Sequence, residues 1–353
     1  MNVPTLTHEA LSVLQRLISI PSVSRNETAA ADFIFDYLSA QGAQPQRHFN
    51  NIWCQHPAPQ GQRPTLLLNA HIDTVKPAAT WQHDPFVPTR EGDRLYGLGS
   101  NDCGGGLVTL MQVFLALRSH NDLPYHLVFL ASAEEEVSGK EGIEAVLPLL
   151  PPIDVALVGE PTGMQPAIAE KGLMVIDCVA HGQSGHAARN EGVNAIYKAL
   201  PCIEWIRTFA FDKQTELLGP VKMSVTMIEA GTQHNVVPDT CRFVIDVRAN
   251  ECYTNEEILE AIRQHWPECD FTPRSTRLRS SRIDASHPLI ERAIALGRQP
   301  FGSPTLSDQA LMRFPSFKMG PGESSRSHTA EEFITLPEIE EAITLYLQLI
   351  TGA

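Results

Sequence analysis

Acidic and histidine side chains recur in this sequence, most of them just after apolar runs of the kind that form buried strands. The candidates are His71, Asp73, Asp102, the three consecutive acids at 134–136, Glu160 and His328. Strands that end in such groups present them along one edge of a sheet, where they are stable only if solvated, paired or bound to metal. Two imidazoles and several carboxylates suit a pair of zinc-like divalent ions, so the pattern predicts a metal-dependent hydrolase.

The spacing of these residues suggests which of them could bind metal, orient a ligand or act as a general base. His71 and Asp73 are two apart, so in a strand their side chains point to the same side, and Asp73 can orient the imidazole of His71 while His71 binds metal. An isolated pair of this kind is more often a polar strand end that meets solvent. Adjacent residues in the run Glu134-Glu135-Glu136 point in different directions, so one Glu can bind metal while its neighbour serves as a general base. The alternative for the three acids is a solvent-exposed loop without a catalytic role.

Asp102 stands beside an unusual glycine run at 104–106. Glycines lack a Cβ, so we expect the backbone here to approach a ligand closely. A glycine turn capped by Asp102 is the simpler structural interpretation. Glu160 and His328 are weak signals individually, and the metal-site hypothesis rests on the order and combination of all these residues.

Composition limits the class of protein. At 353 residues the chain is too long for one typical core, and we expect two domains. The net charge of −14 argues against nucleic acid as a partner. Seven scattered cysteines without a CxxC pair favour reduced thiols. The first 19 residues do not resemble a signal peptide, and no apolar run approaches the roughly 20 residues that span a bilayer. We therefore expect a soluble cytoplasmic protein without membrane contact.

The order of expected elements divides the chain. Helices expected at 7–19, 27–40 and 105–118 alternate with strands expected at 51–56, 65–70, 125–132 and 153–158. This alternation predicts an α/β sheet with helices on both faces. Between 173 and 282 the pattern becomes that of a small α+β sheet. We predict one domain from residues 1–172 and 283–353, and an inserted domain at 173–282.

With these motifs in place, the chain resembles the M20 family of zinc amidohydrolases and metallopeptidases, in the branch of acetylornithine deacetylase and succinyl-diaminopimelate desuccinylase. The resemblance rests on Ile18-Ser19-Ile20-Pro21-Ser22-Val23-Ser24, His71-x-Asp73-Thr74-Val75, Gly97-x-Gly99-Ser100-x-Asp102, Ala133-Glu134-Glu135-Glu136, Gly159-Glu160-Pro161-Thr162 and His328. It implies a metallopeptidase-like catalytic domain, with a central sheet flanked by helices, and an inserted α+β domain that serves as lid and dimerisation domain.

The resemblance also implies roles. Two Zn²⁺ ions, with Co²⁺ as the alternative, would share Asp102. His71 and Glu160 would complete one site, and Glu135 with His328 the other. Glu134 would be the general base that takes a proton from the attacking water, and Asp73 would orient His71. The peptide bond between residues 102 and 103 is expected to be cis.

In the inserted domain, the resemblance implies contacts with substrate. His186, in Gly182-Gln183-Ser184-Gly185-His186-Ala187, would stabilise the oxyanion in the active site of a partner subunit of a homodimer. Asn235 and Arg248 would contact substrate, Arg248 through a carboxylate. Outside this domain, Ser307 would face the substrate's α-carboxylate. For Arg248, an exposed salt bridge is an equally good interpretation.

The substrate is the least legible part. The family usually has a bulky residue and a base after the shared Asp, whereas this chain has Cys103 and Gly104. Gly320-Pro321-Gly322 resembles acetylornithine or acetyl-lysine deacetylases. The best prediction is a small-molecule N-acyl amino acid, N2-acetyl-L-ornithine in arginine biosynthesis. Deacetylation or desuccinylation of citrulline, lysine or diaminopimelate derivatives is the alternative. A dipeptidase and a non-catalytic metabolite-binding relative are the further alternatives.

Overall fold

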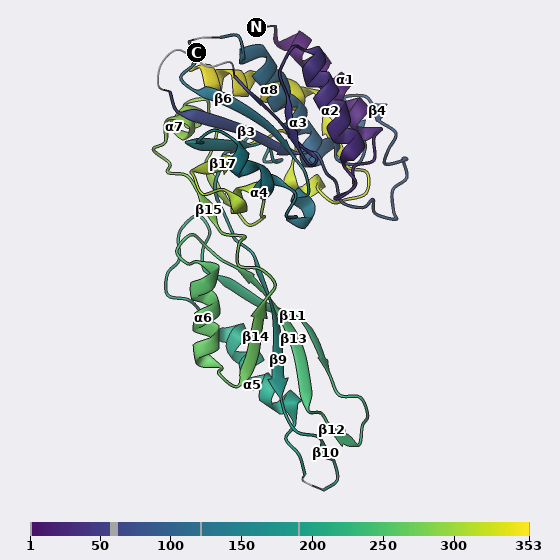
Figure 1. Cartoon of the computed structure of the whole chain (residues 1–353), viewed down its shortest axis with the longest axis vertical. Helices are drawn as coiled ribbons and strands as arrows, with labels where there is room; N and C mark the ends of the chain where they lie inside the picture. The colour runs from purple at the N-terminus through teal and green to yellow at the C-terminus, as the bar shows by residue number, and fades with distance from the viewer. Residues whose placement is uncertain (1, 57–62, 121, 190, 353) are drawn as a thin grey trace. The chain divides into compact units, whose positions relative to one another are not determined.

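The computed structural model describes residues 2–56, 63–120, 122–189 and 191–352 (Figure 1). The chain forms two compact units: the first comprises Met1–Ile168, Ile283–Phe301 and Ser307–Ala353, and the second Ala169–Arg282 and Gly302–Leu306. The sequence-based division has its borders after residues 172 and 282, and the two compact units meet after residues 168 and 282. The short segment from Gly302 was not expected in the second unit. It joins because Gly302 packs on the backbone of Leu217, where a Cβ would meet the carbonyl oxygen at 2.1 Å.

The first unit is built on a mixed sheet with strand order β1-β2-β6-β3-β7-β17-β8. The strands are β1 Gln46–His48, β2 Asn51–Gln55, β3 Thr65–His71, β6 His126–Ser132, β7 Val155–Val158, β8 Ala167–Glu170 and β17 Ser316–Lys318. Strands β6, β3, β7 and β17 run parallel, and the chain passes from the first unit into the second within β8. Every residue of β3 is buried, as expected of a strand covered on both faces. A small separate sheet contains β4 Thr89–Glu91, β5 Arg94–Tyr96 and β18 Phe333–Thr335.

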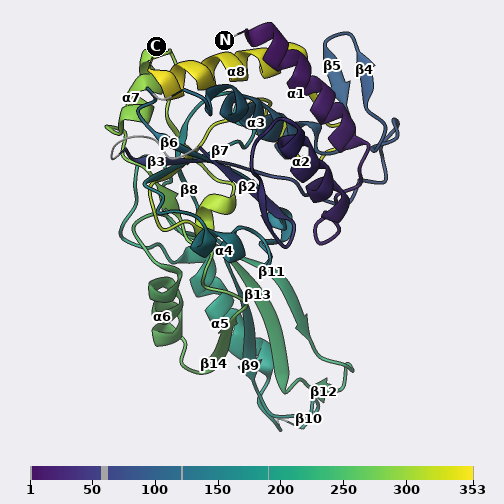
Figure 2. The same cartoon turned by 45° about the horizontal axis from the view of Figure 1, so that its top comes forward.

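Helices flank this sheet (Figures 1 and 2). They are α1 Val3–Ile18, α2 Thr28–Ala40, α3 Gly105–Leu117, α4 Ile143–Val146, α7 Pro288–Ala295 and α8 Leu336–Thr351. Helix α3 lies on β3 and β6 and is covered by α1 and α8, so its residues are buried almost all round. The predicted α/β class is confirmed. Among the described helices, none is both long and apolar enough to cross a membrane.

The second unit has an antiparallel sheet of order β11-β13-β9-β14. Its elements are β9 Met174–His181, β10 Gly185–His186, α5 Ala195–Thr208, β11 Lys222–Ala230, β12 Val236–Val237, β13 Thr240–Arg248, α6 Asn255–His265, β14 Cys269–Pro273 and β15 Ser281–Arg282; β16 Phe301–Ser303 begins at the unit border. Alternate residues of β9 are buried, because α5 and α6 cover one face of the sheet and leave the other open. The α+β pattern predicted for the inserted segment is found.

Candidate metal centre

The ends of neighbouring parallel strands bring the predicted acids and histidines together. His71 is the last residue of β3 and pairs with Ser132, the last residue of β6. Glu134 follows two residues after β6, and Glu160 follows two residues after β7. Because β6, β3 and β7 are adjacent and parallel, these residues meet at one edge of the sheet.

Asp102 lies between the two predicted histidines. Its Oδ1 is 3.2 Å from Nε2 of His71, and its Oδ2 is 3.6 Å from Nε2 of His328. Oε1 of Glu160 is 3.7 Å from the same nitrogen of His71. The Asp102 carboxylate thus offers one oxygen to each side of the centre, as a ligand shared by two ions must do. The peptide bond that follows Asp102 is cis, as predicted.

The glutamate that reaches His328 is Glu136, one residue beyond the predicted Glu135. Oε2 of Glu136 is 2.9 Å from Nε2 of His328. Glu136 also forms a group with His71 and Asp102, in which one ligand atom of each lies within 4.8 Å of the others. The predicted pairing of Glu135 with His328 is therefore not the one found. The carboxylate of Glu135 instead interacts electrostatically with His71 and Glu160, and burial is the main cause that raises its pKa well above the ordinary value.

Glu134 is turned into its own loop. It adopts a left-handed φ of 55°, and its Oε2 accepts a 3.4 Å hydrogen bond from the backbone N–H of Glu141. A Cβ on Gly139 would lie 1.6 Å from that oxygen, so the carboxylate packs directly on this glycine. The backbone N–H of Glu134 donates to the buried Glu27, which is 0% exposed. These contacts fix the turn from which Glu135 and Glu136 project.

Asp73 orients more than the predicted imidazole. Its carboxylate is 3.6 Å from Nδ1 of His71, and that nitrogen donates a 2.9 Å hydrogen bond to the Asp73 backbone carbonyl. The nitrogen Nε2 of His71 is thereby left available to bind a metal ion. The two oxygens of Asp73 also accept the backbone N–H groups of Glu135 and Glu136, at 3.0 and 3.1 Å. Although burial opposes the charge, the hydrogen bonds with His71, Ser24 and Glu135 hold the pKa of Asp73 below its ordinary value.

Glu332 is a structural residue that the sequence analysis missed. It is 1% exposed, and its carboxylate accepts the backbone N–H groups of Gly99, Asn101 and Asp102 at 3.1, 2.9 and 2.8 Å. Burial raises its pKa to about 8. Glu332 therefore shapes the loop that carries Asp102. Its position four residues after His328 is the only hint of this in the sequence.

The glycine run serves protein packing. A Cβ on Gly106 would lie 1.7 Å from the carbonyl oxygen of Gly159, and one on Gly105 would lie 2.2 Å from Ile334. In the described structure, the close backbone approach at this run is that of Gly106 to the loop that carries Glu160.

The donor set fits divalent metal. Oε1 of Glu160 is buried and has no hydrogen-bond partner in the described part of the chain. Burial, together with the charge of Asp102, raises the pKa of Glu160 to about 8. A buried carboxylate oxygen without a donor is costly unless a cation neutralises it. Imidazole nitrogens and carboxylate oxygens at this spacing are ligands that zinc-like ions accept.

The substrate-binding residues predicted in the second unit are less organised. His186 is exposed and pairs with Val236 in the short β10–β12 ladder, and Asn235 next to it is exposed as well. Arg248 is engaged within its own strand, because its Nε and Nη2 bind both oxygens of Asp246 at 2.8 and 3.1 Å. In the first unit, Ser307 is 2% exposed, and its hydroxyl caps the turn Asp308–Leu311 by accepting from the N–H of Gln309.

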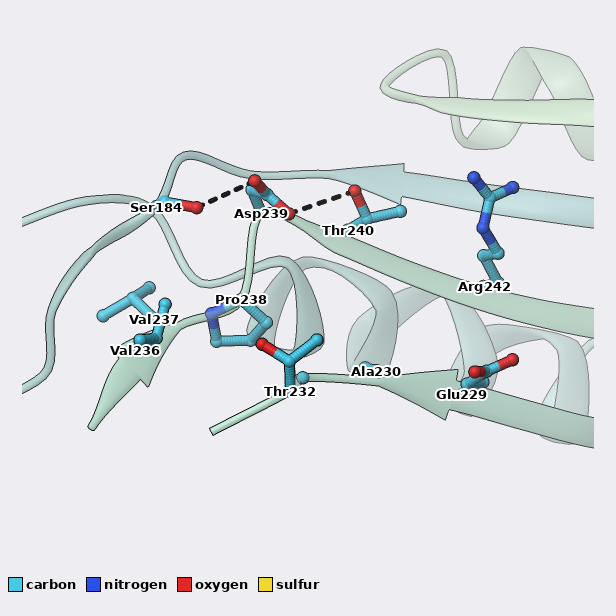
Figure 3. Close-up of a pocket in the computed structure, with 11 residues that line it drawn as sticks. Ser184, Glu229, Ala230, Thr232, Val236, Val237, Pro238, Asp239, Thr240 and Arg242 are labelled. Carbon is cyan, nitrogen blue, oxygen red and sulfur yellow. Dashed lines mark hydrogen bonds between the residues drawn. The ribbon is translucent and has the colours of Figure 1, made fainter. Parts of the chain in front are cut away.

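The loop region of the second unit also contains a pocket of about 400 Å³ (Figure 3). Ser184 donates a 2.8 Å hydrogen bond to Asp239, and Thr240 bonds to the other oxygen of the same carboxylate. Arg242 and Glu229, which face each other across β13 and β11, line its far end. The pocket thus combines polar walls with the apolar segment 236–238.

Comparisons with known proteins agree with this geometry. The model of peptidase family M20/M25/M40 matches residues 67–352. Proteins named succinyl-diaminopimelate desuccinylase from Paracoccus denitrificans and Corynebacterium glutamicum are 29% and 28% identical to this chain. The first alignment covers 83% of this chain and 82% of the relative, and the second covers 98% and 97%.

Solved structures show the same fold. The aminopeptidase PepT from Bacillus cereus has a TM-score of 0.79 at 17% identity, and a tripeptidase from Staphylococcus aureus has 0.78 at 20% identity. Each comparison covers 98% of both chains. The family match, which spans well over half of the sequence, includes all the metal-centre residues described above. This chain belongs to peptidase family M20/M25/M40 and is a metal-dependent hydrolase of amide bonds.

Proposed function

We propose that this protein is a zinc-dependent deacylase that hydrolyses the amide of an N-acyl amino acid. The observation that carries the proposal is the Asp102 carboxylate between His71 and His328, beside the buried Oε1 of Glu160, which accepts no hydrogen bond from the described residues. The relatives named succinyl-diaminopimelate desuccinylase favour an N-succinyl amino acid as substrate. N2-acetyl-L-ornithine, the substrate favoured by the Gly320-Pro321-Gly322 motif, is the second candidate.

In this proposal Asp102 would be shared by two Zn²⁺ ions. His71 and Glu160 would hold one ion, and Glu136 and His328 would hold the other. When bound, the ions polarise the amide carbonyl and lower the pKa of water. Asp73 keeps Nε2 of His71 free for binding and fixes the turn that carries Glu136.

The same geometry supports Glu135, rather than Glu134, as the general base of this proposal. Glu135 interacts electrostatically with His71 and Glu160, whereas the Glu134 carboxylate packs on Gly139. Burial raises the pKa of Glu135, and a carboxylate with a raised pKa is a stronger base than a solvated one. Glu135 would take a proton from the attacking water and return it to the leaving amine. The role of general base, which the family resemblance gives to Glu134, is thus assigned to Glu135 in this proposal.

A homodimer through the second unit is part of the proposal. In the described sheet, β11 is an edge strand that pairs on one side only, with β13. Met227 and Ile228 on β11 are 63% and 58% exposed, and Tyr197 and Leu200 on the adjacent α5 are 71% and 50% exposed. Exposed apolar side chains beside an unpaired edge are typical of an interface. In such a dimer His186 would serve the partner's active site.

Solution mass tests the dimer. Replacing both Met227 and Ile228 with Lys is expected to yield monomers in light scattering after size exclusion. A Val87→Lys variant, at another exposed apolar residue, is expected to keep the native mass. A monomeric parent protein with full activity at low concentration would overturn both the dimer and the role of His186.

An amide-hydrolysis panel tests the function. Zinc- or cobalt-loaded protein is offered the N-succinyl and N-acetyl forms of diaminopimelate, ornithine, citrulline and lysine, together with a dipeptide; chelated protein is the control. Turnover of one acyl amino acid that is lost on chelation is the expected result. If the protein hydrolyses only the dipeptide, its function is that of a peptidase and not of a deacylase. If protein with two bound metal ions hydrolyses none of these compounds, the proposal is overturned.

A further inference from the structure

Cys103 places a thiol beside the half of the centre that contains His71 and Glu160. It follows Asp102 directly and is only 1% exposed. One ligand atom from each of His71, Cys103 and Glu160 lies within 4.8 Å of the other two. All seven cysteines lie in the described residues and are free thiols, and Cys103 alone among them joins such a group.

The side chain of Cys103 is aimed at the loop that carries Glu160. Its Sγ donates a 3.1 Å hydrogen bond to the backbone carbonyl of Gly159. A thiol needs its proton for this bond, whereas a sulfur that binds a cation binds as thiolate. Cys103 therefore cannot donate to Gly159 and bind a cation at the same time. The hydrogen bond to Gly159 nevertheless holds the sulfur close to the position from which it would bind the cation.

An independent observation points to a cation at the same place. Oε1 of Glu160 is buried without a hydrogen-bond partner among the described residues, and it is 3.7 Å from Nε2 of His71. His71 and Lys318 act on the Glu160 carboxylate only electrostatically, so among the described residues no hydrogen bond satisfies this buried oxygen. A cation bound by a carboxylate oxygen of Glu160 and a ring nitrogen of His71 comes within reach of the Cys103 sulfur.

We propose that Cys103 is a protein ligand of the ion held by His71, Glu160 and Asp102. This half of the centre then offers nitrogen, oxygen and sulfur, whereas Asp102, Glu136 and His328 offer only nitrogen and oxygen. Thiolate favours zinc and similar soft ions, and oxygen ligands suit magnesium and manganese. The two halves are therefore unequal, and the Cys103 half selects the softer ion. On binding, the thiol proton is released to solvent. The inference rests on the proposed metal centre but on no particular substrate.

X-ray absorption tests the proposal on the unaltered protein. At one equivalent of zinc, a sulfur shell is expected at about 2.3 Å in addition to nitrogen and oxygen at about 2.0–2.2 Å. With one equivalent of cobalt, a thiolate-to-cobalt charge-transfer band is expected in the near ultraviolet. A first equivalent with only nitrogen and oxygen neighbours would overturn the proposal and leave Cys103 as a packing residue.

Two substitutions sharpen the test. Cys103→Ser is expected to remove the band, and Cys252→Ser, which alters a half-buried cysteine of the second unit, is expected to keep it. Cys103→Ser should also lower the affinity for the first zinc ion by roughly tenfold or more, which is the usual effect of changes around a metal's ligands. Its affinity for manganese should change far less. Equal weakening of zinc and manganese, or a band of unchanged strength, would contradict the proposal.

These readouts are separate from the proposed activity. If the sulfur signal appears and no acyl amino acid is hydrolysed, the metal ligand stands and the deacylase function falls. If hydrolysis is found without a sulfur signal, the function stands and Cys103 is not a ligand. Should Cys103→Ser fail to fold, the absorption spectrum of the unaltered protein decides the question.

Discussion

The two units use the same kinds of charged side chain in opposite ways. In the first unit, Asp73 and Glu332 are buried and bind backbone N–H groups that shape the metal centre. In the second, ion pairs lie on the open face of the sheet, namely Arg274–Asp177, Arg248–Asp246 and His181–Asp270. A buried carboxylate needs specific partners, whereas an exposed ion pair contributes little and tolerates loss. Burial with converging donors, and not residue type, separates the candidate site from the charged surface.

The largest effect is expected at the general base. Glu135→Gln is expected to lower kcat by about 10²–10⁴-fold, the usual contribution of a general base, and to leave two metal ions bound. Glu134→Gln should lower kcat far less, because its carboxylate packs on Gly139. Steady-state kinetics together with metal analysis measures both.

The reverse order of effects would restore the sequence-based assignment. A larger loss of kcat in Glu134→Gln than in Glu135→Gln, at equal metal content, would show that the first acid of the run is the base. Loss of a metal ion in Glu135→Gln would instead make Glu135 a ligand.

The second effect concerns stability. Glu332→Ala leaves the backbone N–H groups of Gly99, Asn101 and Asp102 without their acceptor. Since an unsatisfied buried donor costs about 1–3 kcal/mol, we expect the free energy of unfolding to fall by roughly 3 kcal/mol or more. Asp270→Ala removes an exposed partner of His181 and should cost under about 1 kcal/mol.

Chemical denaturation followed by tryptophan fluorescence compares the two variants with the parent protein. Equal decreases in the free energy of unfolding in Glu332→Ala and Asp270→Ala would contradict the contrast between the units. Such a result would mean that the N–H groups of the Asp102 loop find water or another acceptor.

The sequence predicts the strand-end residues well because their signal is local. His71 and Glu160 each close an apolar strand, and parallel neighbours must bring such ends to one edge. The acids at 134–136 could not be assigned individually, because three identical residues carry no register. The left-handed backbone of Glu134 decides which of them face the histidines, and that conformation depends on contacts with Glu27 and Gly139.

Other residues were missed because their contacts are distant in sequence. Glu332 meets Asp102 across 230 positions, and nothing near Glu332 indicates a buried acceptor. The pairing of Arg248 with Asp246 was within reach of sequence reasoning, since residues two apart share one face of a strand. The alternating pattern of β13 predicts the strand, but not which of its cations is already occupied.

The third effect is a dependence of stability on pH that metal should suppress. In chelated protein, burial raises the pKa of Glu160 and Glu332 to about 8, from 4.5. The hydrogen bond with Glu136 raises the pKa of His328 to about 9, from 6.5. All three groups bind protons more tightly in the folded state, so stability falls as the pH rises, between about 4.5 and 8 for the acids and between about 6.5 and 9 for His328.

Metal binding needs deprotonated ligands, so the stabilisation by zinc should grow over the same range. Thermal unfolding is expected to show a melting temperature that falls from about pH 5 to 9 in chelated protein and falls less with zinc. The second unit has no such cluster of buried acids among its described residues, so this pH dependence of stability is expected of the first unit and not of the second. A melting temperature of chelated protein that rises with pH in this range would contradict the assignment of these three groups.

The smallest effect is expected at Arg248, where the two interpretations of the sequence diverge. Its guanidinium is about one-third exposed and binds both oxygens of Asp246, an arrangement worth under about 1 kcal/mol to stability. If Arg248 stays with Asp246, Arg248→Gln should change KM by no more than about fivefold, the equivalent of that energy. If KM rises far more at constant kcat, then the side chain leaves Asp246 to bind the substrate carboxylate. Asp246→Asn separates the cases, because freeing Arg248 lowers KM only when Arg248 is a substrate ligand.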